Sequence, residues 1–458
     1  MRSKLKQFGL VMTGMVAGVM ISLNFSANAD RSTQVPLPVD ELRAYADVFN
    51  AIKQGYVEPV EDKKLITDSI SGMLSGLDPH SAYLDAEAFK DLQVGTQGEF
   101  GGLGIEVGME DGFVKVISPI EDTPAFRAGV MAGDLIVKLD DTPVKGMSLN
   151  DAVKRMRGKP RTDITLTIMR KGESRPIVLT LTREVIKVQS VRSKVIEPGF
   201  GYLRVAQFQE NTAAAVVDHL NRLAAEGEMQ GLVLDLRNDP GGLLHGAVGV
   251  SAAFLPANTL VVSTDGRTED AKREYRAIPA DYLRGTRNDF LRGLPAVAKD
   301  VPMVVLVNAG SASASEIVAG ALQDHKRATV MGTQTFGKGS VQTILPLNNN
   351  TAIKLTTARY YTPNGRSIQA KGIEPDIVVE ETANGSSRRM READLQGHLG
   401  NDKDPEAEAR QKAEGARAPA DGADEAEPVR FELAGENDFQ LQQAIRLLKG
   451  EQIVQNEK

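Results

Sequence analysis

A serine and a lysine occupy loop positions where each could take part in nucleophilic catalysis. Ser313 stands between the apolar run 302–307, which predicts a strand, and a predicted helix over 316–323. A serine at such a turn is exposed and faces the positive end of the helix dipole. Ser313 and Glu316 also form an S-x-x-E capping box, which explains both residues without any chemistry. Ser313 is therefore a candidate nucleophile only if the chain also supplies a base.

Histidine is the usual base for a serine nucleophile. His325 lies twelve residues after Ser313 on the same predicted helix, about 18 Å along its axis, which is out of reach. His245 begins another predicted helix and is not excluded by distance, although packing or capping is its simpler role. Lys338 is the better candidate, because its two flanking glycines let the backbone approach another segment. Burial lowers the pKa of a lysine that has no carboxylate partner, and the neutral amine can then act as a general base. The alternative is that Lys338 is an ordinary exposed lysine in a loop.

A second glycine-rich segment, residues 101–107, precedes a predicted strand. Successive backbone N–H groups in such a segment can turn inward and hold a carboxylate, while the strand offers its edge to an extended peptide. A turn without any ligand is the alternative. Residues 125–136 and the helix predicted from residue 149 follow at distances that resemble a bacterial PDZ domain, whose glycine loop binds a C-terminal carboxylate. The loop residues concerned are Gly102, Leu103, Gly104 and Ile105.

The elements that must position these residues fall into three regions. Residues 39–97 show the three-and-four spacing of amphipathic helices, first at 42–52 and again at 65–74. Residues 98–183 contain short β runs and one helical stretch. From residue 201, β and α runs alternate, which predicts a parallel or mixed sheet covered by helices. The runs in this last region are 231–236, 244–254, 302–307, 316–323 and 328–331.

The composition excludes several other kinds of chemistry. The 458 residues contain no cysteine, which rules out disulfides, thiol nucleophiles and iron–sulfur clusters. The 5 histidines lack the spacing of a zinc site, so we expect no metal and no cofactor. The formal net charge is −7, so nucleic acid is not an expected partner.

Both ends of the chain differ from the middle. Basic residues at positions 2, 4 and 6 precede the uncharged segment 8–25, and residues 27–29 fit a signal-peptidase site. We expect export and cleavage after Ala29, with an uncleaved membrane anchor as the alternative. Residues 400–430 hold only Val429 among Val, Ile, Leu, Met and Phe, which predicts a disordered acidic linker. Beyond it, apolar residues at 439–448 line one side of a short helix that must dock on this chain or on a second copy.

Several motifs in order resemble one family. Residues 308–316 and 335–342 resemble the C-terminal processing peptidases, serine endopeptidases that use a Ser–Lys dyad with a supporting Gln. Leu77-Asp78-Pro79-His80-Ser81 and the stretches 234–242 and 361–367 match the family in the same order, and the resemblance covers about residues 40–400. One departure is Asp239, where the family more often has Asn.

The resemblance implies a role for each site residue. Ser313 is the nucleophile, Lys338 the general base, and Gln342 orients the lysine, while Ser311 and Ser315 keep turn and helix-end roles. The oxyanion needs two backbone donors. We expect one to be the N–H of Ala314, at the helix N-terminus, and the other to be that of Gly241 or Gly242.

The fold implied is mixed α/β: a crotonase-like (ClpP/crotonase) α/β protease core with an inserted PDZ domain and helical terminal regions. The predicted division is 1–29 signal peptide, 30–97 helical region, 98–183 PDZ domain, 184–399 protease core, 400–430 linker and 431–458 terminal amphipathic helix.

The expected function is that of a periplasmic serine endopeptidase that captures proteins by their C-termini. The resemblance implies substrates such as cell-wall hydrolases and a lipoprotein adaptor, and the apolar stripes of the terminal helices predict a homo-oligomer. An inactive PDZ adaptor of the cell envelope is one alternative, against which the retention of Ser313, Lys338 and Gln342 counts. An acyl-CoA enzyme on the same scaffold is another, although an exported protein would rarely meet that cofactor.

Overall fold

The computed structural model describes residues 37–120, 122–173, 175–285, 288–381, 390–404, 435 and 437–454. The expected signal peptide and most of the expected acidic linker lie outside these residues. The chain divides after Ser69 into two units. Within the described residues, no helix combines the length and the apolar character needed to cross a bilayer.

The first unit contains the two helices predicted from their spacing. Helix α2 spans Val39–Gly55, and α3 spans Asp62–Ser75 and continues into the second unit. The Tyr45 hydroxyl lies 2.6 Å from Ser69 Oγ. None of the residues of α2 is buried, so the apolar stripe that includes Leu42 and Val48 is exposed to solvent.

Residues 99–187 contain an antiparallel sheet around its own core. The strand order is β3-β4-β5-β7-β8, with β6 paired to β5, so β3 lies at an edge. Val114, Ile136, Leu166 and Ile168 are fully buried there. The strands are β3 (Ile105–Glu110), β4 (Phe113–Pro119), β5 (Leu135–Leu139), β6 (Thr142–Pro143), β7 (Asp163–Met169) and β8 (Ile177–Thr182), with helices α5 (Pro124–Arg127) and α6 (Leu149–Met156). A short ladder of β2 (Glu99–Gly102) and β9 (Glu184–Lys187), preceded by α4 (Ala86–Gln97), leads into and out of this sheet.

A second, six-stranded sheet has the order β10-β11-β12-β15-β16-β19, in which every pair from β11 onward is parallel. Alternate residues of its buried strands face opposite sides, which explains their continuous apolar sequences. Its strands are β10 (Val191–Glu197), β11 (Phe200–Val205), β12 (Gly231–Asp235), β15 (Met303–Val307), β16 (Thr329–Gly332) and β19 (Ile377–Val378). This confirms the parallel or mixed sheet predicted from the alternating runs.

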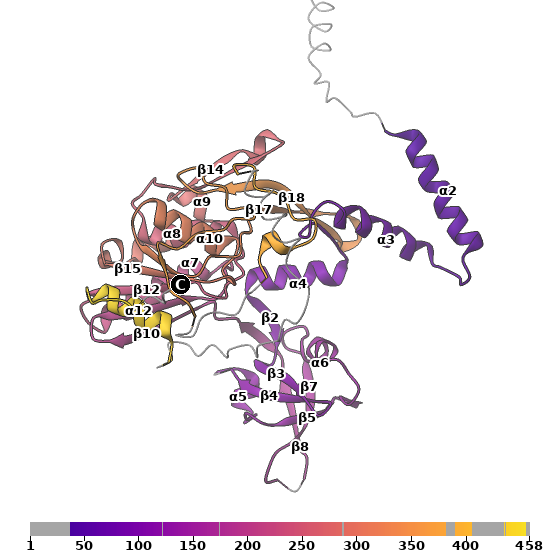
Figure 1. Cartoon of the computed structure of the whole chain (residues 1–458). Helices are drawn as coiled ribbons and strands as arrows, with labels where there is room; N and C mark the ends of the chain where they lie inside the picture. The colour runs from indigo at the N-terminus through magenta and orange to yellow at the C-terminus, as the bar shows by residue number, and fades with distance from the viewer. Residues whose placement is uncertain are drawn as a thin grey trace, which may run out of the picture. The chain divides into compact units, whose positions relative to one another are not determined.

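Helices cover both faces of this six-stranded sheet (Figure 1). Leu232 and Leu234 face one side and pack with α7 (Thr212–Ala225), α8 (Leu244–Phe254) and α10 (Ala314–Asp324). Val233 faces the other side, where α12 (Phe439–Leu448) covers the sheet. Helix α12 buries Leu441, Ala444 and Ile445 there. The sequence left open whether this terminal helix docks on its own chain or on a second copy, and in the structure α12 packs on its own chain.

A third sheet is antiparallel and was not predicted. It joins β1, β18, β13 and β14 in that order, with β17 paired to β18. The strands are β1 (Ala82–Leu84), β13 (Leu260–Gly266), β14 (Arg273–Arg276), β17 (Ser340–Pro346) and β18 (Ala352–Tyr361). Within this sheet, η1 (Glu269–Ala271) connects β13 to β14 and η4 (Asn348–Asn350) connects β17 to β18. The other short helical elements are α9 (Pro279–Tyr282), η2 (Phe290–Gly293) and η3 (Ala296–Lys299), which lie between β14 and β15, and η5 (Glu392–Asp394), which follows β19. Because β17 starts at Ser340, this sheet fixes the loop that carries Lys338.

Candidate active site

Ser313 is the N-cap of α10, at the turn that follows β15. Its backbone has φ 56°, a left-handed conformation that non-glycine residues rarely adopt, and its exposed fraction is 9%. Such strain at a strand-to-helix turn is typical of a nucleophile that must project from the chain. The structure thus places Ser313 at the strand-to-helix turn that the sequence predicted, but its side chain is largely buried rather than exposed.

Glu316 connects the turn of Ser313 to the loop of Lys338. Its Oε2 accepts the backbone N–H of Ser313 at 2.7 Å and that of Lys338 at 3.0 Å. Its Oε1 accepts the Thr335 hydroxyl at 2.6 Å and the Gly337 N–H at 2.7 Å. The side chain is completely buried, and burial raises its pKa to about 7 against the effect of these four hydrogen bonds. The sequence showed Glu316 only as half of a capping box and gave no sign of the second loop.

Lys338 is partly buried, and its environment favours the neutral amine. Burial is the main cause that lowers its pKa, and the ammonium group of Lys354 acts in the same direction. The carboxylates of Glu392, Glu316 and Asp78 oppose this shift. The lowered pKa agrees with the property expected of a lysine base.

The side chains of the three residues expected to act together are not joined by hydrogen bonds. Within the described residues, Ser313 Oγ, Lys338 Nζ and the Gln342 amide share none with one another. Gln342 Nε2 instead donates to Ser340 Oγ at 2.8 Å and lies 3.4 Å from Thr356 Oγ1. Catalytic contacts are commonly long in unliganded enzymes and tighten when substrate binds. The role of Gln342 stays a prediction.

The loop after β12 packs directly on Ser313. A Cβ added to Gly241 would lie 2.9 Å from Ser313 Cβ and 2.8 Å from the Ala314 nitrogen, so only glycine fits. The Gly241 N–H donates to Asp239 Oδ1 at 2.8 Å and is already engaged. Of the two glycines predicted for the oxyanion hole, Gly242 is therefore the better donor, beside Ala314.

Asp239 is the buried centre of this loop. Its backbone oxygen accepts the Ala312 N–H at 2.9 Å and the Ser315 hydroxyl at 3.0 Å, which holds it against the nucleophile turn. Burial raises the pKa of its carboxyl group to about 8, and within the described residues its Oδ2 is buried without a hydrogen-bond partner. Ser311 donates to the Leu236 oxygen at 2.7 Å. Ser311 and Ser315 thus have the turn and helix-end roles predicted for them.

A second network supports the Lys338 loop from its other side. Gln369 accepts the Gly339 N–H at 3.0 Å and donates to Glu392 Oε1 at 2.9 Å. Glu392, which is completely buried, lies 2.8 Å from His80 Nε2 through its other oxygen. The sequence contained His80 within a matched motif, but nothing in it indicated a partner 312 residues away.

The two histidines weighed as bases have other contacts. His325 caps the far end of α10 and lies 2.7 Å from the Leu260 oxygen. His245 lies 3.0 Å from Glu210 Oε2. The distance argument against His325 is confirmed, and His245 begins α8 as predicted.

The expected carboxylate-binding loop connects β2 to the edge strand β3. Gly104 has φ 76°, and a Cβ there would lie 2.3 Å from Thr123 Cβ, so the loop backbone packs closely on the turn before α5. Leu103 is buried at 3% exposure. Because only β4 pairs with β3 in the described structure, the second edge of β3 is available to an extended peptide. The sequence predicted this loop and its strand.

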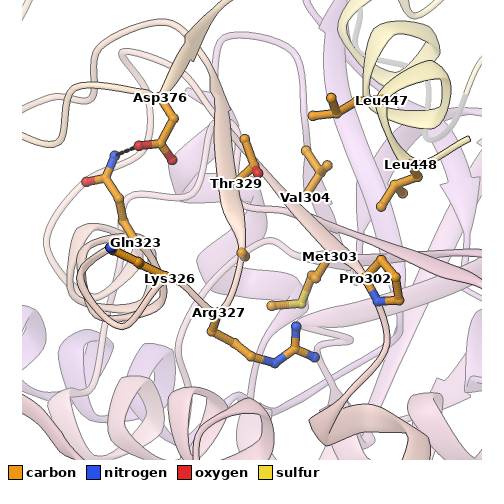
Figure 2. A pocket seen from close by; sticks show the side chains of 11 residues that line it. Pro302, Met303, Val304, Gln323, Lys326, Arg327, Thr329, Asp376, Leu447 and Leu448 are labelled. Carbon is orange, nitrogen blue, oxygen red and sulfur yellow. Dashed lines mark hydrogen bonds between the residues drawn. The ribbon is translucent and has the colours of Figure 1, made fainter. Parts of the chain in front are cut away.

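A cavity of about 540 Å³ lies at the opposite end of α10 from Ser313 (Figure 2). Gln323 and Lys326 line it on one side, and Leu447 and Leu448 of α12 line it on another. At the edge of the cavity, Gln323 Nε2 donates a hydrogen bond to Asp376 Oδ1 at 3.0 Å. Ser313 and the residues of its turn do not line this cavity.

Family models and known proteins match most of this chain. The sequence model of "Peptidase family S41" matches residues 199–379, that of "PDZ domain" matches 101–181, and that of "Activating protease CtpB N-terminal domain" matches 15–88. The "Carboxy-terminal-processing protease" of Bartonella bacilliformis is 45% identical over 446 residues, which cover 95% of this chain and 95% of that protein. The "Carboxyl-terminal-processing protease" of Synechocystis sp. is 36% identical over 353 residues, covering 75% and 78%. A solved "photosystem II D1 C-terminal processing protease" is 31% identical, with 73% of this chain and 92% of that chain covered and a TM-score of 0.41.

The family model and the named relatives show that this chain is a serine-type protease, in which a PDZ domain precedes the parallel sheet that presents Ser313. This chain belongs to peptidase family S41, with the carboxy-terminal-processing proteases.

Proposed function

We propose that this protease hydrolyses peptide bonds with Ser313 as nucleophile and Lys338 as general base. The observation that carries the proposal is that Glu316 Oε2 accepts the backbone N–H groups of both residues, at 2.7 and 3.0 Å. One buried carboxylate thus holds the nucleophile turn and the base loop together. Two reacting groups fixed in this way lose little entropy when they react.

In the proposed mechanism, Ser313 Oγ attacks the substrate carbonyl carbon while Lys338 Nζ takes the hydroxyl proton. The N–H groups of Ala314 and Gly242 stabilise the oxyanion. Lys338 then returns the proton to the leaving amine, and the resulting acyl-enzyme is hydrolysed by a water that Lys338 deprotonates. Gln342 orients the lysine in the substrate complex.

We further propose that the PDZ domain selects substrates by their C-termini. The backbone N–H groups of residues 102–105 would bind the terminal carboxylate, and the free edge of β3 would pair with the preceding residues. The proposed location is the periplasm, on the strength of the predicted export signal at residues 1–29.

Proteolysis of a disordered test protein examines both proposals. The wild-type chain should cleave it, Ser313→Ala should not, and Ser75→Ala, an exposed serine that bonds only within α3, should match the wild type. The same test protein with an amidated C-terminus should show a lower kcat/KM, because the amide carries no charge. Cleavage by Ser313→Ala would overturn the nucleophile assignment, and equal cleavage of the amidated protein would overturn C-terminal selection.

A further inference from the structure

Arg237 lies two residues after the end of β12 and opens the loop that packs on Ser313. It is 1% exposed, and its guanidinium group is shared between two carboxylates. Nε and Nη2 donate to Asp235 at 3.0 and 2.7 Å. Nη1 and Nη2 donate to the two oxygens of Asp438 at 2.8 and 2.7 Å. Planar bidentate pairs of this kind fix a guanidinium in both position and orientation.

Asp438 belongs to the far C-terminal end of the chain, where it is the N-cap of α12. Its Oδ1 also accepts the Leu441 N–H at 3.1 Å. Gln440, in the first turn of α12, accepts from Arg237 Nη1 at 3.0 Å and donates to the Val379 oxygen at 2.7 Å. Helix α12 therefore meets the protease core through two polar side chains on Arg237, in addition to its apolar face.

The loop that Arg237 opens is held against the nucleophile turn along its length. Asn238 donates its backbone N–H to Asn308 Oδ1 at 2.9 Å. The backbone oxygen of Asp239 accepts the Ala312 N–H, and Gly241 lies against Ser313. A displacement of Arg237 would therefore be transmitted to the residues that flank the proposed oxyanion hole.

We propose that α12 is a positioning element of the active site, in which Asp438 fixes the 237–242 loop through Arg237. The inference rests on the proposed role of Ser313 as nucleophile. Arg204 also lies 3.4 Å from Asp235, so Asp235 faces two guanidinium groups, and Asp438 supplies a second carboxylate to Arg237. Without the charge of Asp438, the buried guanidinium loses part of its compensation and the start of the loop loses its fixed orientation.

The competing interpretation is that α12 only covers the apolar face of the sheet. In that case α12 contributes only to stability. Weakening its contacts lowers the amount of folded enzyme but does not change the catalytic rate of each folded molecule. A positioning role makes a different prediction, because the contacts of the 237–242 loop with substrate matter most in the transition state. Loss of the contact between α12 and Arg237 then lowers kcat and leaves KM nearly unchanged.

The test is Asp438→Asn in the full-length chain, with kcat and KM measured per folded molecule on a peptide substrate. Asparagine caps a helix as well as aspartate does, so the substitution removes the charge and keeps the cap. We expect kcat to fall at least about tenfold and KM to change less than about twofold. Asp85→Asn is the matched control, because Asp85 caps α4 and accepts the Ala88 N–H without contacting Arg237. It should leave kcat unchanged.

Two further variants keep the outcome decisive. If Asp438→Asn does not fold, Gln440→Ala removes one hydrogen bond from Arg237 and keeps every charge; it should lower kcat about threefold at constant KM. Ser313→Ala is measured in parallel. The positioning role is overturned if the folded Asp438→Asn variant, or Gln440→Ala in its place, has a kcat within twofold of the wild type. If Ser313→Ala is inactive in the same experiment, the proposed function stays intact. An active Ser313→Ala overturns the proposed function itself.

Discussion

Glu316 Oε2 accepts the backbone N–H of Lys338 at 3.0 Å, although the two residues lie 22 positions apart on different elements. The same oxygen accepts the N–H of Ser313. A carboxylate that normally only caps a helix thus also fixes the loop that carries the proposed base. The active-site geometry depends on both of its oxygens acting as acceptors.

Glu316→Gln should reduce kcat by about 100-fold. The glutamine amide has only one acceptor oxygen, and its NH₂ group would face hydrogen-bond donors that the second carboxylate oxygen now accepts. The measurement is kcat on a protein substrate, with thermal unfolding as a check on folding. Glu374→Gln, an exposed glutamate that pairs with Lys371, should retain full activity. A folded Glu316→Gln enzyme with more than a third of the wild-type kcat would refute the role of this carboxylate.

Activity should rise from acidic to mildly alkaline pH as Lys338 loses its proton, since only the neutral amine accepts the serine proton. Lys354 helps to lower the pKa of Lys338, so Lys354→Met should move this rise toward higher pH. The pH dependence of kcat/KM measures the shift, with Lys371→Met as the control. A rate that stays flat from pH 5 to 10, or a Lys354→Met profile that moves toward lower pH, is incompatible with the assignment.

Asp239→Asn should stabilise the protein increasingly as the pH rises. Burial raises the pKa of Asp239 to about 8, above the ordinary value, so the folded state retains a proton that the unfolded state releases. The stability that this proton contributes is complete below about pH 4 and is lost as the pH approaches 8. We expect the advantage of the asparagine variant to reach on the order of 2 kcal/mol at pH 9 and to be small at pH 4. Denaturant unfolding at both pH values measures it, and an advantage independent of pH would be evidence against a neutral buried acid.

The exposed apolar stripe of α2 leads us to propose a homo-oligomer formed through the N-terminal helices. Val48→Asp places a charge in that stripe and should lower the mass measured by light scattering. Asp47→Asn, on the neighbouring exposed position, should not. A monomeric wild-type protein would refute the proposal directly.

The sequence predicted the elements that have strong local patterns. The helix 244–254 coincides with α8, and the strand before Ser313 lies within the predicted run, because fully buried elements are continuously apolar. The antiparallel sheet of β13, β17 and β18 was missed. β18 carries Lys354, two threonines and Arg359 and is only partly buried along most of its length, so it lacks the continuous apolar run from which the buried strands were predicted.

The contacts that complete the site join residues far apart in sequence, and no local pattern indicates them. His80 meets Glu392, and Arg237 meets Asp438 across 201 positions. Each contact depends on how the sheets and helices pack, so a single sequence shows the residues but not their partners. The docking site of the terminal helix stayed open for the same reason: its apolar stripe is visible in the sequence, but the sheet face that covers the stripe is not.

The most direct test of the Ser–Lys assignment is the activity of Lys338→Arg, because arginine keeps the charge and much of the size of lysine but stays protonated. Proteolysis of a disordered protein should be measured from pH 6 to 10 for the wild type, Lys338→Arg and Lys338→Ala, after unfolding curves show that all three are folded. The account predicts that both variants lose at least about 1,000-fold in kcat at every pH, because each removes the base of a catalytic unit. A Lys338→Arg enzyme with a tenth or more of the wild-type rate would contradict it.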